Sequence, residues 1–177
     1  MFLFEIQKVL VQKAIEKAEY YGIPRDIAAK NIVQQDTLSQ YPTNIFEYNL
    51  PVFHITNPPY LYLGYIAKHG GRNLSYFKGI NEGYQDLYQI ALMNDLRNNI
   101  EIMTYIIPSN YLFSDSSSNK IRKDFLNSYS IKKVYLFEDK IFDNTGTNVG
   151  IFFFNKKIYS QDENLNFTGI KIKKGNK

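Results

Sequence analysis

The chain has 177 residues, of which 44% are hydrophobic and 16% aromatic, enough to form the buried core of one ordinary domain. It has no cysteine and two histidines, which excludes disulfides, a thiolate nucleophile and a zinc site built on sulfur or on several histidines. The net charge of +4 permits a polyanionic partner without requiring one.

The apolar segments are short. No run of about 18 apolar residues is present, so we expect no membrane-spanning helix. The first residues, Met1 to Glu5, carry no basic leader of the kind that a secretory signal requires. The sequence therefore predicts a cytoplasmic protein without a metal site or a membrane partner.

Short apolar runs and longer periodic segments follow one another, a pattern typical of strands and helices that alternate in an α/β protein. We expect strands at residues 2–4, 31–35, 52–56, 101–107, 131–137 and 149–154. We expect helices at residues 6–21, 26–29, 86–97 and 120–127. The glycine-rich residues 61–84 are predicted to be a mobile or ligand-shaped loop, and 143–146 a turn. Residues 167–174 alternate isoleucine with lysine and fit either an edge strand or a linker.

Polar residues follow three of the predicted strands. Glu5, Asp36 and Asn57 each come at a strand end, and ligands of open α/β sheets bind outside the carboxyl ends of the strands. One carboxylate is suited to accept hydrogen bonds from the two hydroxyls of a ribose, and the other to accept a hydrogen bond from an adenine amino group. The sequence thus favours a site for a nucleoside cofactor and its substrate.

The tetrapeptide Asn57-Pro58-Pro59-Tyr60 has a specific chemical use at such a strand end. Two prolines cannot donate to a sheet ladder, so the strand must stop. The side-chain oxygen of Asn57 and the carbonyl of Pro58 then present two fixed acceptors for the two hydrogens of an adenine amino group. Such a base must be flipped out of the duplex, and stacking on Tyr60 is worth roughly 1–3 kcal/mol.

These motifs resemble those of a known family, the amino-methylating DNA methyltransferases of restriction-modification systems, and in particular their adenine-specific branch. The resemblance covers nearly the whole chain. It rests on residues 2–6 (FLFEI), 35–38 (QDTL), 57–60 (NPPY), 86–88 (DLY), 106–112 (IIPSNYL), 121–126 (IRKDFL), 141–142 (IF) and 147–151 (TNVGI).

The resemblance implies S-adenosylmethionine as cofactor and double-stranded DNA as partner. It assigns the ribose to Glu5 and the cofactor adenine to Ile6 and to the motif that contains Asp36, Thr37 and Leu38. Catalysis is assigned to Asn57, Pro58, Pro59 and Tyr60, and Phe142 would stack on the other face of the flipped base.

The implied fold is α/β: a partial Rossmann-like methyltransferase fold with a doubly wound, mostly parallel sheet, one antiparallel strand near the C-terminus and the first strand missing. Residues 1–159 would form the catalytic domain, and 160–177 an edge strand or linker. The family's first cofactor motif would precede Glu5, so we expect an incomplete and inactive fragment that depends on a missing N-terminal segment. It would also depend on a target-recognition domain or specificity subunit.

Other interpretations remain open at this stage. The tetrapeptide also fits an ordinary turn, Glu5 a solvated residue, Asp36 an Asx-turn and Phe142 a core residue. A methyltransferase acting on a protein glutamine amide would need the same tetrapeptide, because that amide presents the same chemistry. A non-catalytic DNA-binding module is the third alternative.

Overall fold

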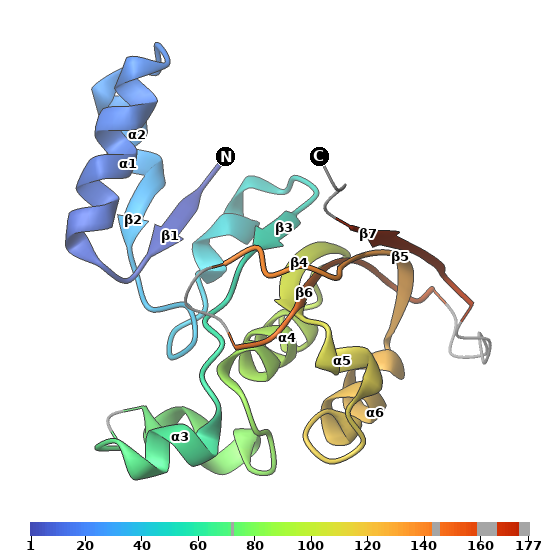
Figure 1. Ribbon diagram of the computed structural model, residues 1–177. Coiled ribbons are helices and arrows are strands. Elements are labelled where there is room, and N and C mark those ends of the chain that lie inside the picture. Colours follow the sequence, from blue (N-terminus) through green and yellow to red (C-terminus); the bar gives the residue numbers. More distant parts are fainter. Residues whose placement is uncertain (72, 143–145, 159–165, 174–177) are drawn as a thin grey trace. The chain divides into compact units, whose positions relative to one another are not determined.

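The chain folds into two compact units, residues 1–50 and 51–177. The computed structural model describes residues 1–71, 73–142, 146–158 and 166–173, and Figure 1 gives the course of the chain. Within these ranges, no helix is both long enough and apolar enough to cross a membrane.

The first unit is a strand-helix-strand arrangement. Strands β1 (Leu3–Glu5) and β2 (Ile32–Gln34) pair in parallel, and helices α1 (Lys8–Tyr20) and α2 (Arg25–Asn31) connect them. The chain leaves α1 through Gly22, whose φ of 86° lies in the left-handed region that glycine adopts without a steric cost. The short 3-10 helix η1 (Thr43–Tyr48), which sequence analysis did not predict, follows near the end of the unit.

The second unit contains a five-stranded sheet with the order β3-β4-β6-β5-β7. Its strands are β3 (Phe53–Thr56), β4 (Ile102–Pro108), β5 (Tyr129–Phe137), β6 (Val149–Lys156) and β7 (Thr168–Ile172). Strand β6 runs antiparallel to its neighbours β4 and β5, whereas β3 is parallel to β4 and β7 is parallel to β5. Four strands therefore share one direction, which confirms the predicted α/β fold with a mostly parallel sheet and one antiparallel strand near the C-terminus.

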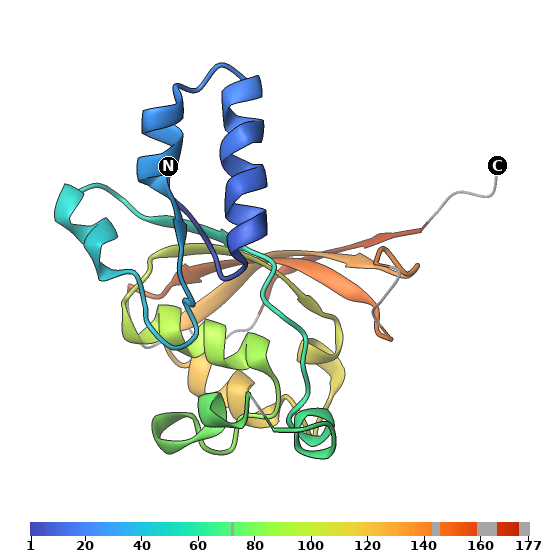
Figure 2. The same ribbon diagram turned by 90° about the vertical axis from the view of Figure 1, so that its left-hand side faces the viewer.

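One face of this sheet packs against helices α4 (Leu87–Arg97) and α6 (Asn119–Leu126), as Figure 2 shows. Met103, Tyr105 and Ile107 alternate along β4 and are fully buried. Phe125 of α6 stacks on Tyr129 with 4.5 Å between the ring centroids and meets Phe154 of β6 edge-on at 5.1 Å. The core of this unit is thus an aromatic layer between the sheet and its helices.

Residues 61–86, hereafter the lobe, connect β3 to α4. Sequence analysis predicted a loop here, which is wrong: the lobe contains α3 (Leu63–Lys68) and the 3-10 helices η2 (Leu74–Phe77) and η3 (Gly79–Asn81). Its glycines suggested a loop because they are dense in the sequence. In the structure Gly70, Gly79 and Gly83 have positive φ and adjoin the ends of these helices.

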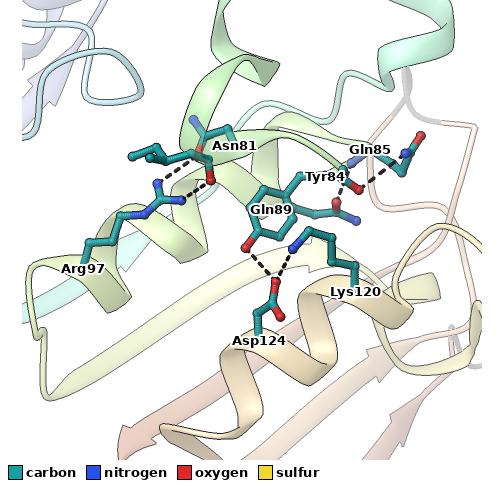
Figure 3. A network of polar contacts seen from close by, with 9 residues as sticks. Asn81, Tyr84, Gln85, Gln89, Arg97, Lys120 and Asp124 are labelled. Atoms are coloured by element: carbon teal, nitrogen blue, oxygen red, sulfur yellow. Dashed lines mark hydrogen bonds and ion pairs between the residues drawn. The ribbon is translucent and has the colours of Figure 1, made fainter.

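Polar contacts hold the lobe against α4 and α6 (Figure 3). Arg97 of α4 donates to the side chain of Asn81 at 2.8 Å. Tyr84 donates to Asp124 of α6 at 2.8 Å, and Lys120 pairs with the same carboxylate at 2.6 Å. The lobe is therefore fixed at its C-terminal half by two separate helices.

Two further segments bear on the predictions. The short helix α5 (Asn110–Phe113) follows β4 and was not predicted. Residues 143–145 of the predicted turn lie outside the described residues. The division into a domain of residues 1–159 and a segment of 160–177 stays a prediction.

Two buried tyrosines differ in whether their hydroxyl groups are hydrogen-bonded. Tyr129 donates to the Ile100 carbonyl at 2.7 Å, whereas the hydroxyl of Tyr111 has no partner among the described residues. We expect Tyr129→Phe to lower the free energy of unfolding by about 1 kcal/mol, and Tyr111→Phe to leave it unchanged or raise it. Urea denaturation of the two variants measures the difference, and an equal loss for both would contradict it.

Candidate functional site

The tetrapeptide Asn57-Pro58-Pro59-Tyr60 lies at the carboxyl end of β3. The ladder between β3 and β4 ends at the pair Thr56 and Tyr105. Pro58 and Pro59 carry no N–H group, so they cannot extend that ladder, and the chain turns away from the sheet. Asn57 is exposed there, Pro58 is buried, and Tyr60 is half-buried. The strand therefore ends at Thr56, as the sequence predicted.

Tyr60 turns back toward β4, the strand that pairs with β3. Its hydroxyl donates to the carbonyl of Ile106 at 2.8 Å, one residue beyond the last ladder pair of β4. The same hydroxyl also donates to the side-chain oxygen of Asn57. Burial, and secondarily the Asp86 carboxylate, raise the pKa of Tyr60 above its usual value. The hydroxyl is therefore protonated, and able to donate, at any physiological pH.

Asp86, the last residue of the lobe, is bonded to Leu61, its first residue, and so closes the base of the lobe. Its Oδ1 accepts from the Leu61 backbone N–H at 3.0 Å and from the Tyr88 N–H at 3.4 Å, so it also caps the N-terminus of α4. A backbone bond from Leu63 to the Gln85 carbonyl at 2.8 Å reinforces this closure. Burial raises the pKa of Asp86 to about 6, against the opposing effect of its backbone hydrogen bonds.

A second carboxylate fixes the strand that leads to the tetrapeptide. Asp95 of α4 is fully buried and accepts from the Tyr105 hydroxyl at 2.6 Å. His54 of β3 lies with its Nδ1 2.5 Å from the same carboxylate. These contacts hold β3 and β4 against α4, three residues before Asn57.

Phe142 belongs to a connection that starts at the same end of the sheet as the tetrapeptide. This connection runs from the carboxyl end of β5 to the start of β6, and Phe142 is half-buried. The start of β6 meets the end of β4, with Val149 opposite Pro108 and a backbone bond from Ser109 to Asn148 at 2.9 Å. Because β3 and β4 are parallel, that end of β4 adjoins Asn57. The connection that contains Phe142 therefore starts at the same end of the sheet as the tetrapeptide, and the role of Phe142 stays a prediction.

The predicted cofactor residues lie together within the first unit. Glu5 is the last residue of β1 and pairs with Gln34 of β2, and the Gln35 N–H donates to the Glu5 carbonyl at 3.0 Å. The carboxyl ends of β1 and β2 therefore meet at one edge, where Glu5 precedes the exposed Ile6 and Asp36 follows β2. Thr37 and Leu38 are half-buried beside Asp36.

Both carboxylates at this edge also serve the local backbone. Glu5 accepts at 2.8 Å from the N–H of Gln7, the residue at the N-cap position of α1. Asp36 accepts from the Leu38 N–H at 3.1 Å and from the Ser39 hydroxyl at 2.8 Å, which is an Asx-turn. Both carboxylates therefore take part in local hydrogen bonds at the carboxyl ends of β1 and β2.

Sequence analysis missed two groups near the tetrapeptide. Asp86 was noted only as the start of a helix and as part of the motif at residues 86–88, and a pattern of residues carries no sign that its carboxylate would accept from Leu61. The carbonyl of Ile106 is a backbone group, so nothing in the sequence distinguishes it from other carbonyls. Only the pairing of β3 with β4 brings it to Tyr60.

Comparison with known proteins gives one family match and several structural ones. A family model described as N-6 DNA Methylase matches residues 11–175. No curated protein sequence matches the chain.

The similar solved structures are weakly related in sequence. The M protein of the type I restriction enzyme EcoKI is 17% identical with a TM-score of 0.60, and the match covers 97% of this chain and 35% of that protein. A modification subunit of a putative type I restriction enzyme from Vibrio vulnificus is 14% identical with a TM-score of 0.56, covering 97% and 34%. A putative class I S-adenosylmethionine-dependent methyltransferase from Listeria monocytogenes is 14% identical with a TM-score of 0.60, covering 94% and 48%. These similarities establish the fold, and the chain spans about a third of the length of the first two proteins.

The raised pKa of Asp86 predicts a pH-dependent effect of Asp86→Asn. A carboxyl group whose pKa is higher in the folded protein than in the unfolded chain makes the fold lose stability as pH rises between the two values, here from about 4 to about 6. Asn does not ionise, so we expect Asp86→Asn to become more stable relative to wild type by roughly 2–3 kcal/mol between pH 4 and pH 7.5.

Urea denaturation at both pH values measures this difference. Asp115→Asn is the matched control, because the Asp115 side chain is fully exposed and its removal should give a much smaller change with pH. A relative loss of stability by Asp86→Asn as pH rises would show that the folded protein favours the charged carboxylate.

Proposed function

Because the chain belongs to the N-6 DNA methylase family, we propose that it carries the catalytic site of an enzyme that methylates the exocyclic amino group of adenine in DNA. The family membership predicted from the sequence motifs is confirmed. The observation that supports the proposed activity is the position of Asn57-Pro58-Pro59-Tyr60 at the carboxyl end of β3, where Asn57 is exposed and the Tyr60 hydroxyl is bonded to it and to the Ile106 carbonyl.

The two acceptors of the tetrapeptide fit an amino group as substrate. The Asn57 side chain is exposed, and among the described residues no backbone N–H donates to it or to the Pro58 carbonyl. Each oxygen would accept one hydrogen of the adenine amino group, which turns the nitrogen lone pair out of the ring system toward the methyl donor. Since Pro58 is buried and both prolines have a fixed φ, the acceptors need little reorganisation.

The aromatic residues at the same edge would capture the base outside the duplex. The Tyr60 ring is held at its far end by the hydroxyl, so it presents a fixed surface for stacking. Phe142, in the connection between β5 and β6, is the candidate for the other face of the base. Stacking of about 1–3 kcal/mol per base offsets much of the cost of flipping it.

The first unit fits the nucleoside part of the proposed cofactor, S-adenosylmethionine, which supplies the methyl group when bound. The carboxylates of Glu5 and Asp36 lie at one edge of the parallel pair β1 and β2. Glu5 would accept from the ribose hydroxyls, and Asp36 from the adenine amino group. Ile6, with 54% of its surface exposed, would pack on the adenine ring together with the segment of Thr37 and Leu38.

The proposed partners follow from the length and kind of the similar proteins. The similar proteins include M subunits of type I restriction-modification enzymes, and this chain matches about a third of their length. We propose double-stranded DNA as substrate, with a target-recognition domain or specificity subunit to select the site, in the cytoplasm. Activity is proposed for the whole enzyme; the chain by itself is proposed to be an incomplete and inactive part of it.

Replacing the proposed acceptor tests the function. We expect Asn57→Ala in the full-length enzyme to reduce methyl transfer to unmethylated double-stranded DNA by at least about 100-fold, because one of the two acceptors that orient the amino group is lost. Binding of S-adenosylmethionine should stay within about twofold of wild type, since the carboxylates of Glu5 and Asp36 are intact. Transfer of a labelled methyl group and calorimetric titration measure the two quantities.

The control is Asn127→Ala, which removes an exposed asparagine at the end of α6 and should leave both quantities unchanged. Unchanged turnover in Asn57→Ala would remove Asn57 from the mechanism. Methylation of a glutamine-containing peptide in place of DNA would support the protein methyltransferase alternative. DNA binding without any methyl transfer by the wild-type enzyme would support the non-catalytic module.

A further inference from the structure

The hydroxyl of Tyr60 has one hydrogen and two acceptors within reach. One is the carbonyl of Ile106 at 2.8 Å, and the other is the side-chain oxygen of Asn57. Because its pKa is raised by burial, the hydroxyl does not ionise and stays a donor. It can therefore hold either oxygen at a given moment, or share its hydrogen between them.

This choice matters because the two ends of a carboxamide are chemically opposite but nearly equal in shape. The oxygen of Asn57 accepts hydrogen bonds, whereas its nitrogen donates two. An amino group that donates its hydrogens needs the oxygen. A half-turn of the carboxamide would present two hydrogens instead and repel the substrate. An exposed asparagine needs a partner that distinguishes its two ends.

We propose that the Tyr60 hydroxyl is a positioning group for the Asn57 carboxamide: it holds the side-chain oxygen in place until the amino group of the target base arrives. This role rests on the proposed function and is separate from stacking, which uses the ring of Tyr60 and not its hydroxyl. A donor is required for it, and only the hydroxyl of this side chain can donate.

The Ile106 carbonyl completes the arrangement. When the amino group takes the Asn57 oxygen, the hydroxyl of Tyr60 donates fully to Ile106, so the hydroxyl keeps an acceptor after the substrate binds. The backbone next to Tyr60 keeps its place during this exchange because the Leu61 N–H is bonded to Asp86. The exchange therefore needs only the rotation of one hydroxyl.

Tyr60→Phe tests the role, because it removes the hydroxyl and retains the ring. We expect kcat for DNA methylation by the full-length enzyme to fall about tenfold, since without this donor only about one carboxamide in ten would hold its oxygen toward the amino group. The KM for DNA should stay within about twofold of wild type, because stacking is retained. The matched control is Tyr62→Phe, which removes a hydroxyl from a half-exposed tyrosine two residues later and should change neither constant. An unchanged kcat in Tyr60→Phe, or a higher KM with unchanged kcat, would overturn the proposal.

A double-mutant cycle tests the same contact without any activity. The urea midpoints of wild type, Tyr60→Phe, Asn57→Ala and the double variant should be non-additive, with a double shift smaller than the sum of the single shifts. Additive shifts would mean that the hydroxyl does not hold Asn57, and would overturn the proposal. If the wild-type enzyme methylates no DNA, the proposed function fails. A non-additive cycle would then still show the contact, so the two failures are distinguishable.

Discussion

The absence of N–H groups at Pro58 and Pro59 is the constraint on which the candidate site depends. The ladder between β3 and β4 ends at the pair Thr56 and Tyr105, because Pro58 and Pro59 have no N–H group to donate to β4. Two consequences meet at this point. Asn57 is left exposed at the sheet edge, and the tyrosine hydroxyl that follows the prolines donates to the Ile106 carbonyl of β4. The end of the ladder thus produces a rigid arrangement of hydrogen-bond acceptors and an aromatic ring.

Two carboxylates, the buried Asp95 and the partly buried Asp86, hold the surroundings of the tetrapeptide. Asp95 joins His54 and Tyr105 beneath β3 and β4, and Asp86 joins the Leu61 N–H to the start of α4. Burying a carboxylate is costly unless it is hydrogen-bonded, and the raised pKa of Asp86 is the sign of that cost. We interpret Asp86 as a residue that costs stability at neutral pH and holds the lobe closed at its base.

The two units contribute different parts of the proposed reaction. The carboxylates proposed for a nucleoside lie at the carboxyl ends of β1 and β2, and the acceptors and the Tyr60 ring proposed for an extruded base lie at the carboxyl end of β3, beside β4. Each set lies at strand ends because parallel strands place their carboxyl ends, and the loops that follow, at one side of a sheet. This is also why short motifs distributed over the chain were sufficient to predict the family.

Local chemistry determined much of this protein from its sequence. The periodic apolar positions predicted α1 and α4, and the two prolines predicted the end of β3. Each of these signals depends only on residues that are close together in the sequence. The tertiary structure decided what such patterns do not contain. It placed β6 between β4 and β5, made a helical lobe of the glycine-rich segment, and brought the Tyr60 hydroxyl to a carbonyl 46 residues later in the chain. Strand order and backbone acceptors depend on hydrogen bonds between distant segments, and no residue type marks them in advance.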